Sequence, residues 1–399
     1  MIRACVVATL IGALLLCAST PGVPAAGGAR LRDLPEAGIT GIGAAVRARP
    51  LSGETAYRDT LAREFNILVP ENELKWDSVH PARDTYDFSV PDSMVAFAEA
   101  HQMRVFGHVF VWYWQLPAWL TDGGFSREEL MSILEDHIKT VAGHYRGRVE
   151  AWDVVNEAVA DDGSLRHTIW LDTIGPEYID LAFQWAREAD PDARLFYNDY
   201  GGEGLGAKSD AIYALVSDLK ERGVPIDGVG LQVHTSIAWP PLPQDVAANI
   251  ARLGALGLDV RISEMDVRIQ DGTGTTEQKL AAQAEVYRNM ANVCVASPAC
   301  SAFMMWGFTD KYSWIPWFTG SPDWPLIFDE SYEPKSAYWA VYTEFGGVGP
   351  VGGIVEPVTG LPPESPEGDV SRRFAVGVSA GALALVLAAI LWRRNRSRS

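Results

Sequence analysis

Two glutamates carry the clearest chemical signal in this sequence, because each stands at the end of an apolar segment. Glu157 follows the segment 149–155, and Glu264 follows the segment 258–262. Strands of a parallel sheet are buried on both faces, so a carboxylate at the end of such a strand is unusual. Two carboxyl groups that flank a glycosidic bond are what most glycoside hydrolases use. For either glutamate alone, a surface ion pair is the alternative, so the surrounding elements must decide.

Those elements repeat along the chain as apolar, strand-like segments separated by helix-like ones. The eight strand-like segments are 38–46, 65–70, 103–111, 149–155, 193–197, 228–233, 258–262 and 301–306. The helix-like segments between them include 91–101, 126–145, 176–189, 207–222, 242–256 and 276–295. This alternation predicts an α/β protein that folds as a single (β/α)8 TIM barrel. A doubly wound open sheet is the alternative, but no glycine-rich phosphate loop follows the first strand.

A barrel of this kind carries its active site at the carboxyl ends of its strands, so the residues there are candidates for ligand binding. They are carboxylates, amides, amines, imidazoles and aromatic rings. The set comprises Glu71, Asn72, Lys75, His108, Trp112, Gln115, Asn156, Tyr200, Gln232, His234, Asp266, Trp306 and Trp314. Such polar groups bind sugar hydroxyls, and indole rings cover the apolar faces of pyranoses. Core packing is the alternative for any single tryptophan, and a structural role is the alternative for His108.

The composition favours a large acidic domain and excludes some partners. The 399 residues include 14 Trp, 13 Tyr and 14 Phe, which is enough for a large core with aromatic side chains to spare. The net charge is −18, and no basic patch of the kind that binds phosphates is visible. We therefore expect no nucleic-acid partner.

Cysteine positions predict a covalent link. Cys5 and Cys17 lie in the amino-terminal segment, whereas Cys294 and Cys300 lie in the body of the chain. In a secreted protein, two cysteines this close together predict a short-loop disulfide. Because no histidine lies near them in the sequence, we expect no metal site there.

The two ends of the chain are typical of targeting segments. The predicted divisions are a signal peptide at 1–25, a catalytic domain at 30–346, a linker at 347–373, a transmembrane helix at 374–392 and a basic cytoplasmic tail at 393–399. The first apolar run is short for a membrane helix, whereas the second is long enough to span a bilayer and precedes an arginine cluster. We therefore expect secretion and display at the cell surface. A buried helix of a soluble domain and a cleaved wall-sorting signal are the alternatives for 374–392.

The motifs around the two glutamates resemble glycoside hydrolase family 10, whose best-known members are endo-β-1,4-xylanases. The resemblance covers residues 35–345, and its motifs occur in order along the chain. They are Glu71-Asn72-Glu73-Leu74-Lys75-Trp76, Gly107-His108 with Trp112, Gln115-Leu116-Pro117-Ala118-Trp119, Trp152-Asp153-Val154-Val155-Asn156-Glu157-Ala158, Asn198-Asp199-Tyr200, Gln232-Val233-His234, Ser263-Glu264-Met265-Asp266 and Trp306-Gly307-Phe308-Thr309-Asp310-Lys311-Tyr312-Ser313-Trp314. One motif alone would be weak, but this many in order are specific.

The resemblance implies a retaining mechanism with Glu157 as acid/base and Glu264 as nucleophile. His234, Asp266 and Asn156 are then expected to support catalysis, His234 by keeping Glu264 ionised and Asn156 by binding the substrate 2-hydroxyl. The remaining candidates bind substrate: Glu71, Asn72, Lys75, His108, Trp112, Gln115, Tyr200, Gln232, Trp306 and Trp314. Xylan is the expected substrate, and this chemistry implies no metal or organic cofactor.

Three positions depart from the family pattern. Tyr113 stands where histidine is usual, Gly201 where asparagine is usual, and Ile315 where arginine is frequent. All three lie where substrate is expected to bind, so subsite preference stays open. Another β-glycanase, acting on glucan or mixed-linkage chains, is the nearest alternative, since one extra carbon in a pocket discriminates only modestly. A non-catalytic polysaccharide-binding surface protein is a third hypothesis.

Overall fold

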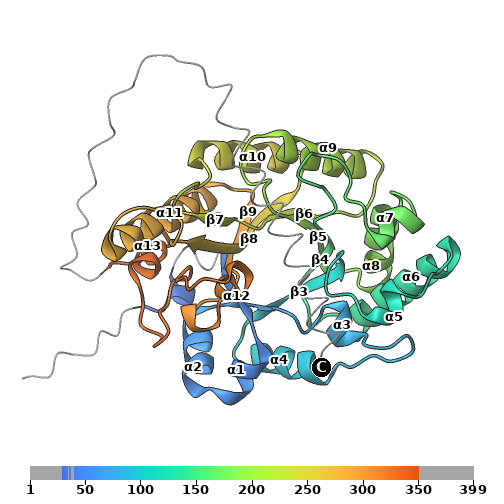
Figure 1. Ribbon diagram of the computed structural model, residues 1–399, viewed down its shortest axis with the longest axis horizontal. Helices are drawn as coiled ribbons and strands as arrows, with labels where there is room; N and C mark the ends of the chain where they lie inside the picture. Colours follow the sequence, from blue (N-terminus) through green and yellow to red (C-terminus); the bar gives the residue numbers. More distant parts are fainter. Residues whose placement is uncertain (1–28, 35, 37–39, 350–399) are drawn as a thin grey trace, which may run out of the picture.

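The computed structural model describes residues 29–34, 36 and 40–349, and its centre is a closed ring of parallel strands (Figure 1). The strands of the ring are β1 (Gly41–Val46), β2 (Ile67–Pro70), β3 (Arg104–Val111), β4 (Ala151–Asn156), β5 (Arg194–Asp199), β6 (Gly228–Leu231), β8 (Asp259–Arg268) and β9 (Cys300–Met305). β6 pairs with β8, and β9 pairs with β1, which closes the ring. The predicted (β/α)8 barrel is therefore confirmed, and the open-sheet alternative is wrong.

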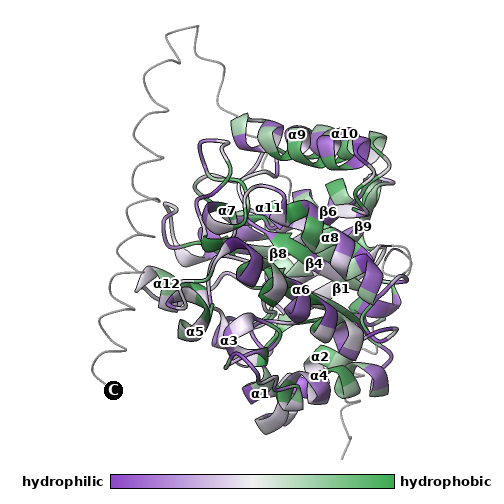
Figure 2. Ribbon diagram, turned by 90° about the vertical axis from the view of Figure 1, so that its right-hand side faces the viewer, coloured by the Kyte–Doolittle hydropathy of each residue, from purple (hydrophilic) through white to green (hydrophobic). Residues whose placement is uncertain are grey.

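Helices surround the ring. They are α1 (Ala48–Gly53), α2 (Thr55–Glu64), α3 (Trp76–Val79), α4 (Ser89–Ala100), α5 (Ala118–Thr121), α6 (Arg127–His144), α7 (Ile169–Thr173), α8 (Tyr178–Ala189), α9 (Ala207–Glu221), α10 (Pro243–Ala255), α11 (Thr276–Ala296), α12 (Ile315–Thr319) and α13 (Ser336–Glu344). Six of them, α4, α6 and α8 to α11, match the helix-like segments of the sequence. Figure 2 shows polar and apolar residues alternating along α9 and α10, as expected for helices with one buried face.

Strand β8 differs most from its prediction. It runs for ten residues to Arg268, whereas the sequence pattern ended at Ile262 because polar residues follow. Glu264 and Asp266 therefore lie within the strand and not after it, and both are buried. An unpredicted short strand, β7 (His234–Ser236), pairs with this extension and places His234 opposite Asp266.

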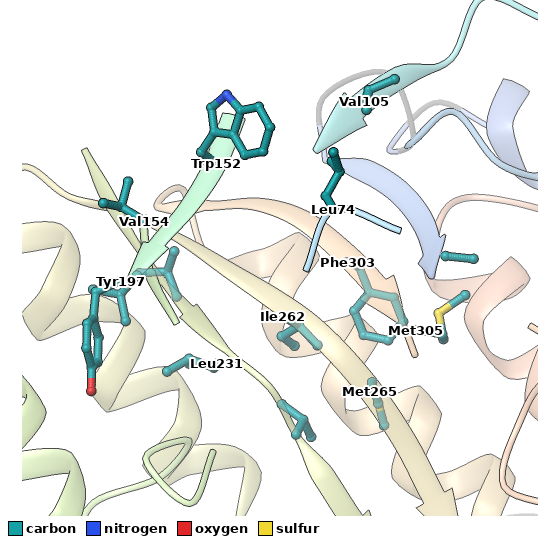
Figure 3. Packing of buried hydrophobic residues seen from close by; sticks show 14 of the residues in the cluster. Leu74, Val105, Trp152, Val154, Tyr197, Leu231, Ile262, Met265, Phe303 and Met305 are labelled. Atoms are coloured by element: carbon teal, nitrogen blue, oxygen red, sulfur yellow. The ribbon is translucent and has the colours of Figure 1, made fainter. Parts of the chain in front are cut away.

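Side chains on the two faces of the strands form two separate apolar clusters. The cluster inside the barrel comes from the strands and the residue that follows β9: Ala45, Ile67, Val69, Phe106, Ala151, Phe196, Ala302, Met304 and Trp306. The larger cluster packs the strands against the helices, and Figure 3 shows Trp152, Val154, Ile262 and Phe303 within it. Successive strand residues point to opposite faces, which is why Ala151 and Trp152 belong to different clusters. This packing holds the strand ends, and thus the site, in place.

The predicted disulfide between Cys294 and Cys300 is present and joins the end of α11 to the start of β9. No helix among the described residues is long and apolar enough to cross a membrane. The predicted signal peptide (1–25), transmembrane helix (374–392) and basic tail (393–399) lie outside the described residues, as does the linker from residue 350 onward. These assignments stay predictions.

Candidate active site

Amide side chains join the two predicted catalytic glutamates at the carboxyl end of the barrel. Asn156 donates a hydrogen bond from Nδ2 to Oε1 of Glu157 at 3.1 Å. Asn198 donates from Nδ2 to Oδ1 of Asn156 at 2.9 Å and to Oε1 of Glu264 at 2.6 Å. Gln232 donates from Nε2 to Asn156 at 3.1 Å and to Glu157 at 3.2 Å. The structure thus brings Glu157 and Glu264 into one buried hydrogen-bonded group.

The backbone turns sharply at Glu157, the residue after β4. Its φ is 57°, in the left-handed region that costs a non-glycine residue about 1–3 kcal/mol. Its N–H donates to the carbonyl oxygen of Asn198 at 2.8 Å, and its carbonyl oxygen accepts from Nε of Arg166 at 2.9 Å. These bonds on both sides of the residue hold the strained conformation that aims the Glu157 carboxyl group into the site.

A line of three side chains supports Glu264. His234 lies between Oε2 of Glu264, which is 3.1 Å from Nε2, and Oδ2 of Asp266, which is 2.9 Å from Nδ1. Trp314 donates from Nε1 to the same Asp266 oxygen at 2.8 Å. The predicted contact between His234 and Glu264 is therefore present, and β7 provides it.

The electrostatics of this line favour an ion pair. Burial disfavours the cation of His234, but the Asp266 and Glu264 carboxylates outweigh burial and raise the pKa of His234 well above its ordinary value. Burial also disfavours the Glu264 carboxylate, but the hydrogen bond from His234, the nearby imidazole of His108 and the Asn198 amide together lower the pKa of Glu264. Glu264 is thus kept ionised, as a nucleophile requires.

A second group of candidates gathers beside the carboxylates. Lys75 donates from Nζ to Oε1 of Gln115 at 2.8 Å and to Oδ1 of Asn72 at 3.3 Å, and Gln115 donates to Asn72 at 3.1 Å. The Lys75 ammonium lies 4.8 Å from the ring centre of Trp112 and 5.6 Å from that of Trp306. Burial lowers the pKa of Lys75, against the opposing effect of nearby carboxylates. Indole walls around a fixed amine and two amides suit the binding of sugar hydroxyls.

Glu71 and His108 are held by neighbours. Both carboxylate oxygens of Glu71 lie 2.9 Å from Nε of Arg47. His108 lies within β3, and its Nδ1–H donates to Asp153 at 2.9 Å. Three side chains offer one possible metal ligand atom each, and these atoms all lie within 4.8 Å of one another: they belong to His108, Asp153 and Glu264. Such a group could hold a metal ion. His108 and Asp153 bond each other, and Glu264 accepts from Asn198, so each of these three side chains has a hydrogen-bond partner within the protein.

The other candidates lie on the Glu157 side. Tyr200 accepts a hydrogen bond at its hydroxyl from Arg166 at 3.0 Å, and the Lys208 ammonium lies 3.4 Å from its ring centre. The Arg166 guanidinium also lies 4.7 Å from the ring centre of Tyr113. Burial and the charge of Glu157 raise the pKa of Tyr113, so this unusual residue lies within electrostatic reach of Glu157.

Gly201 and Ile315 are the other two positions at which the chain departs from the family pattern. Gly201 has a φ of 67°, which glycine adopts freely and asparagine tolerates, so both the family residue and this one suit the turn. Ile315 is the first residue of α12 and is buried.

Arg166 does not stand at a strand end, and the sequence does not reveal that Asn198 bridges two residues of the site. Arg166 lies nine residues beyond Glu157 in a loop, so no strand-end pattern includes it. Asn198 was part of a motif, but only the folded barrel shows that its amide bonds both Asn156 and Glu264. The spacing of a single chain contains no signal for either contact.

A closed (β/α)8 barrel with a buried carboxylate pair, bridging amides and indole walls defines a glycoside hydrolase. The model of glycosyl hydrolase family 10 matches residues 31–344. The chain belongs to glycosyl hydrolase family 10, as its motifs predicted.

Named relatives share most of the folded domain. Endo-1,4-beta-xylanase B of Thermotoga neapolitana is 50% identical over 285 residues, covering 71% of this chain and 82% of that protein. Beta-1,4-xylanase of Dictyoglomus thermophilum is 40% identical over 297 residues, covering 71% and 83%. The crystal structure of xylanase 10B from Thermotoga petrophila RKU-1 in complex with xylobiose is similar to this chain with a TM-score of 0.77 and 46% identity, covering 79% of this chain and 97% of that one.

Proposed function

We propose that this family 10 hydrolase is an endo-1,4-β-xylanase that cleaves the xylan backbone with retention of configuration. The observation that carries the proposal is the amide-bridged pair of Glu157 and Glu264, with Glu264 held ionised by His234. The substrate assignment draws its support from relatives named as xylanases, one of which is 50% identical.

In the first step, the ionised Glu264 attacks the anomeric carbon of the sugar. The bond from that carbon to the glycosidic oxygen breaks, and the carboxyl proton of Glu157 passes to this oxygen as the leaving chain departs. The product is a glycosyl ester on Glu264. Asn156 donates to Glu157 and accepts from Asn198, which also bonds Glu264, and it is assigned to the 2-hydroxyl of the reacting sugar.

In the second step, Glu157 has lost its proton and acts as a base. It takes a proton from water while the water oxygen attacks the anomeric carbon, and the ester bond to Glu264 breaks. Two inversions leave the anomeric configuration unchanged. The cation of His234 compensates the charge that returns to Glu264.

The predicted location is part of the proposal. The segment 1–25 would direct secretion, and 374–392 with the arginine-rich tail would anchor the enzyme at the cell surface, where polymeric substrate is met. Proteolysis of intact cells, with recovery of the domain in the medium, tests this location. Recovery of the whole enzyme only from the cell interior would contradict it.

The activity is tested with the full chain and its Glu264→Gln variant on xylan and on mixed-linkage β-glucan. We expect reducing sugars from xylan with the wild-type chain, a loss with the variant, and first products in the β-configuration by NMR. Release of sugars from glucan alone would support the mechanism but would make glucan, and not xylan, the substrate. Binding of folded protein without release from either polymer would support the non-catalytic alternative.

A further inference from the structure

Two tryptophans outside the catalytic group line one surface groove. Trp317, in α12, is 67% exposed, and Trp324, in the following loop, is 36% exposed. Both line a groove of about 560 Å³, together with Pro316, Lys311 and Glu330. That volume falls in the range of about 300–1,000 Å³ usual for ligand sites. Large indoles exposed together on a surface are typical of binding sites.

The backbone that presents Trp324 is held firmly. Its carbonyl oxygen accepts hydrogen bonds from Nε2 of Gln283 at 2.6 Å and from Nζ of Lys335 at 2.7 Å. Its N–H donates to Asp323 at 2.8 Å. None of these bonds uses the indole, so the exposed ring is carried by a backbone segment that is held in place.

The helix that presents Trp317 also borders the active site. Trp314, immediately before α12, packs its ring against Phe318 at 4.8 Å and donates its indole N–H to Asp266. Trp317 lies on the exposed side of the same helix, which projects from the edge of the molecule in Figure 2. Ser313, next to Trp314, lines the groove as well. The short stretch from Ser313 to Trp317 therefore contributes both to the groove and, through Trp314, to the hydrogen-bonded line behind Glu264.

The chemistry of the groove suits a neutral polyol. Flat indoles accept the C–H face of a pyranose, while Glu330 and Ser321 line the groove as polar partners for hydroxyl groups. Lys311, at the same groove, is ion-paired with Glu54. The chain has a net charge of −18, which disfavours nucleic acid and anionic lipid as occupants.

We propose that the groove between Trp317 and Trp324 is a second polysaccharide-binding site, which holds a β-1,4-linked xylan chain outside the catalytic cleft. The inference rests on the proposed xylanase function for the identity of the chain. A polymer held at two places has a raised effective concentration at the cleft. The groove therefore matters for polymeric substrate and not for a disaccharide substrate that only the cleft accommodates.

The test uses the full chain with Trp317→Ala, Trp324→Ala and the double substitution. Trp239→Ala is the matched control, because Trp239 is 52% exposed but belongs to the loop after β7. Binding to insoluble xylan is measured in the inactive Glu264→Gln background. Hydrolysis of soluble xylan and of 4-nitrophenyl xylobioside is measured in the active background.

We expect each groove substitution to weaken xylan binding about two- to tenfold and to raise KM for xylan similarly. The kcat/KM for the aryl xylobioside should stay unchanged, and Trp239→Ala should behave as wild type. Trp324→Tyr should retain binding, because it keeps an aromatic face. Thermal unfolding of each variant identifies any loss of fold, and the tyrosine variant keeps the test valid if Trp324→Ala unfolds.

Unchanged xylan binding in the double variant would overturn the proposal, as would an equal loss in Trp239→Ala. An equal fall on xylan and on the aryl substrate would show that the tryptophans only support the cleft. Concentration-dependent self-association that the substitutions abolish, with xylan binding intact, would assign the groove to a second copy of the chain. If the wild type hydrolyses neither substrate but binds xylan through these indoles, the proposed function fails and the groove assignment stands.

Discussion

Arg166 donates a hydrogen bond from Nε to the backbone carbonyl oxygen of Glu157 at 2.9 Å, directly at the residue whose φ is 57°. The same guanidinium bonds the hydroxyl of Tyr200 and stacks near Tyr113. A left-handed glutamate persists only where its surroundings enforce it. Arg166 is therefore a positioning residue for the proposed acid/base.

Replacing Arg166 by methionine should impair protonation of the leaving group. We expect kcat/KM for xylo-oligosaccharides to fall about tenfold or more, because general acid catalysis supplies about 10²–10⁴ in rate. For 2,4-dinitrophenyl xylobioside it should fall little, since dinitrophenolate leaves without a proton. Steady-state kinetics on both substrates measures the difference, and Arg166→Lys serves as the conservative control. Equal losses on both substrates would contradict a role in aiming Glu157.

Replacing His234 by asparagine should move the acid limb of the pH profile. His234 lowers the pKa of Glu264, so without this cation burial prevails and the pKa of Glu264 rises. Less Glu264 is then ionised in mild acid, and the acid limb of kcat/KM should shift to higher pH. Trp314→Phe removes the indole hydrogen bond to Asp266 but leaves the contact of His234 with Glu264, so its shift should be smaller than that of His234→Asn. An unshifted acid limb in His234→Asn would refute this electrostatic role.

Asp199 should make the stability depend on pH near neutrality. Burial raises its pKa to about 7, against the opposing effect of Lys208. Between about pH 4 and pH 7 the folded state therefore holds a proton that the unfolded state has lost, so this residue stabilises the fold less as pH rises. Asp199→Asn should flatten that part of the stability profile. Urea unfolding at several pH values measures it, and parallel profiles for the two proteins would count against the assignment.

The disulfide should stabilise the fold modestly. Cys294 and Cys300 are six residues apart, and closing so short a loop in the unfolded chain is worth about 2 kcal/mol. The double substitution to alanine should lower the unfolding free energy by that amount, measured by denaturant titration. Wild type in reductant is the matched control and should lose as much. Activity should persist, because β9 begins at Cys300, at the opposite end of the barrel from the site; a large loss of activity in the folded variant would show coupling that the structure does not explain.

Local pattern was enough to predict six of the helices and most strands. Apolar periodicity marked α4, α6 and α8 to α11, and a barrel brings all carboxyl ends of its strands to one face. Glu157 and Glu264 could therefore be paired from their places at strand ends alone. The family motifs then supplied their expected roles.

Tertiary structure decided how those glutamates are held. The strand pattern stopped at Ile262 because Ser263, Glu264 and Asp266 are polar, yet all three are buried in β8. Their partners, among them Asn198 and Trp314, come from other strands and loops. A buried polar group is stable only when such partners are in place, and those partners lie far away in sequence. That is why the sequence alone determined the barrel and the glutamate pair, while only the folded chain determined the bonds that set their charge and direction.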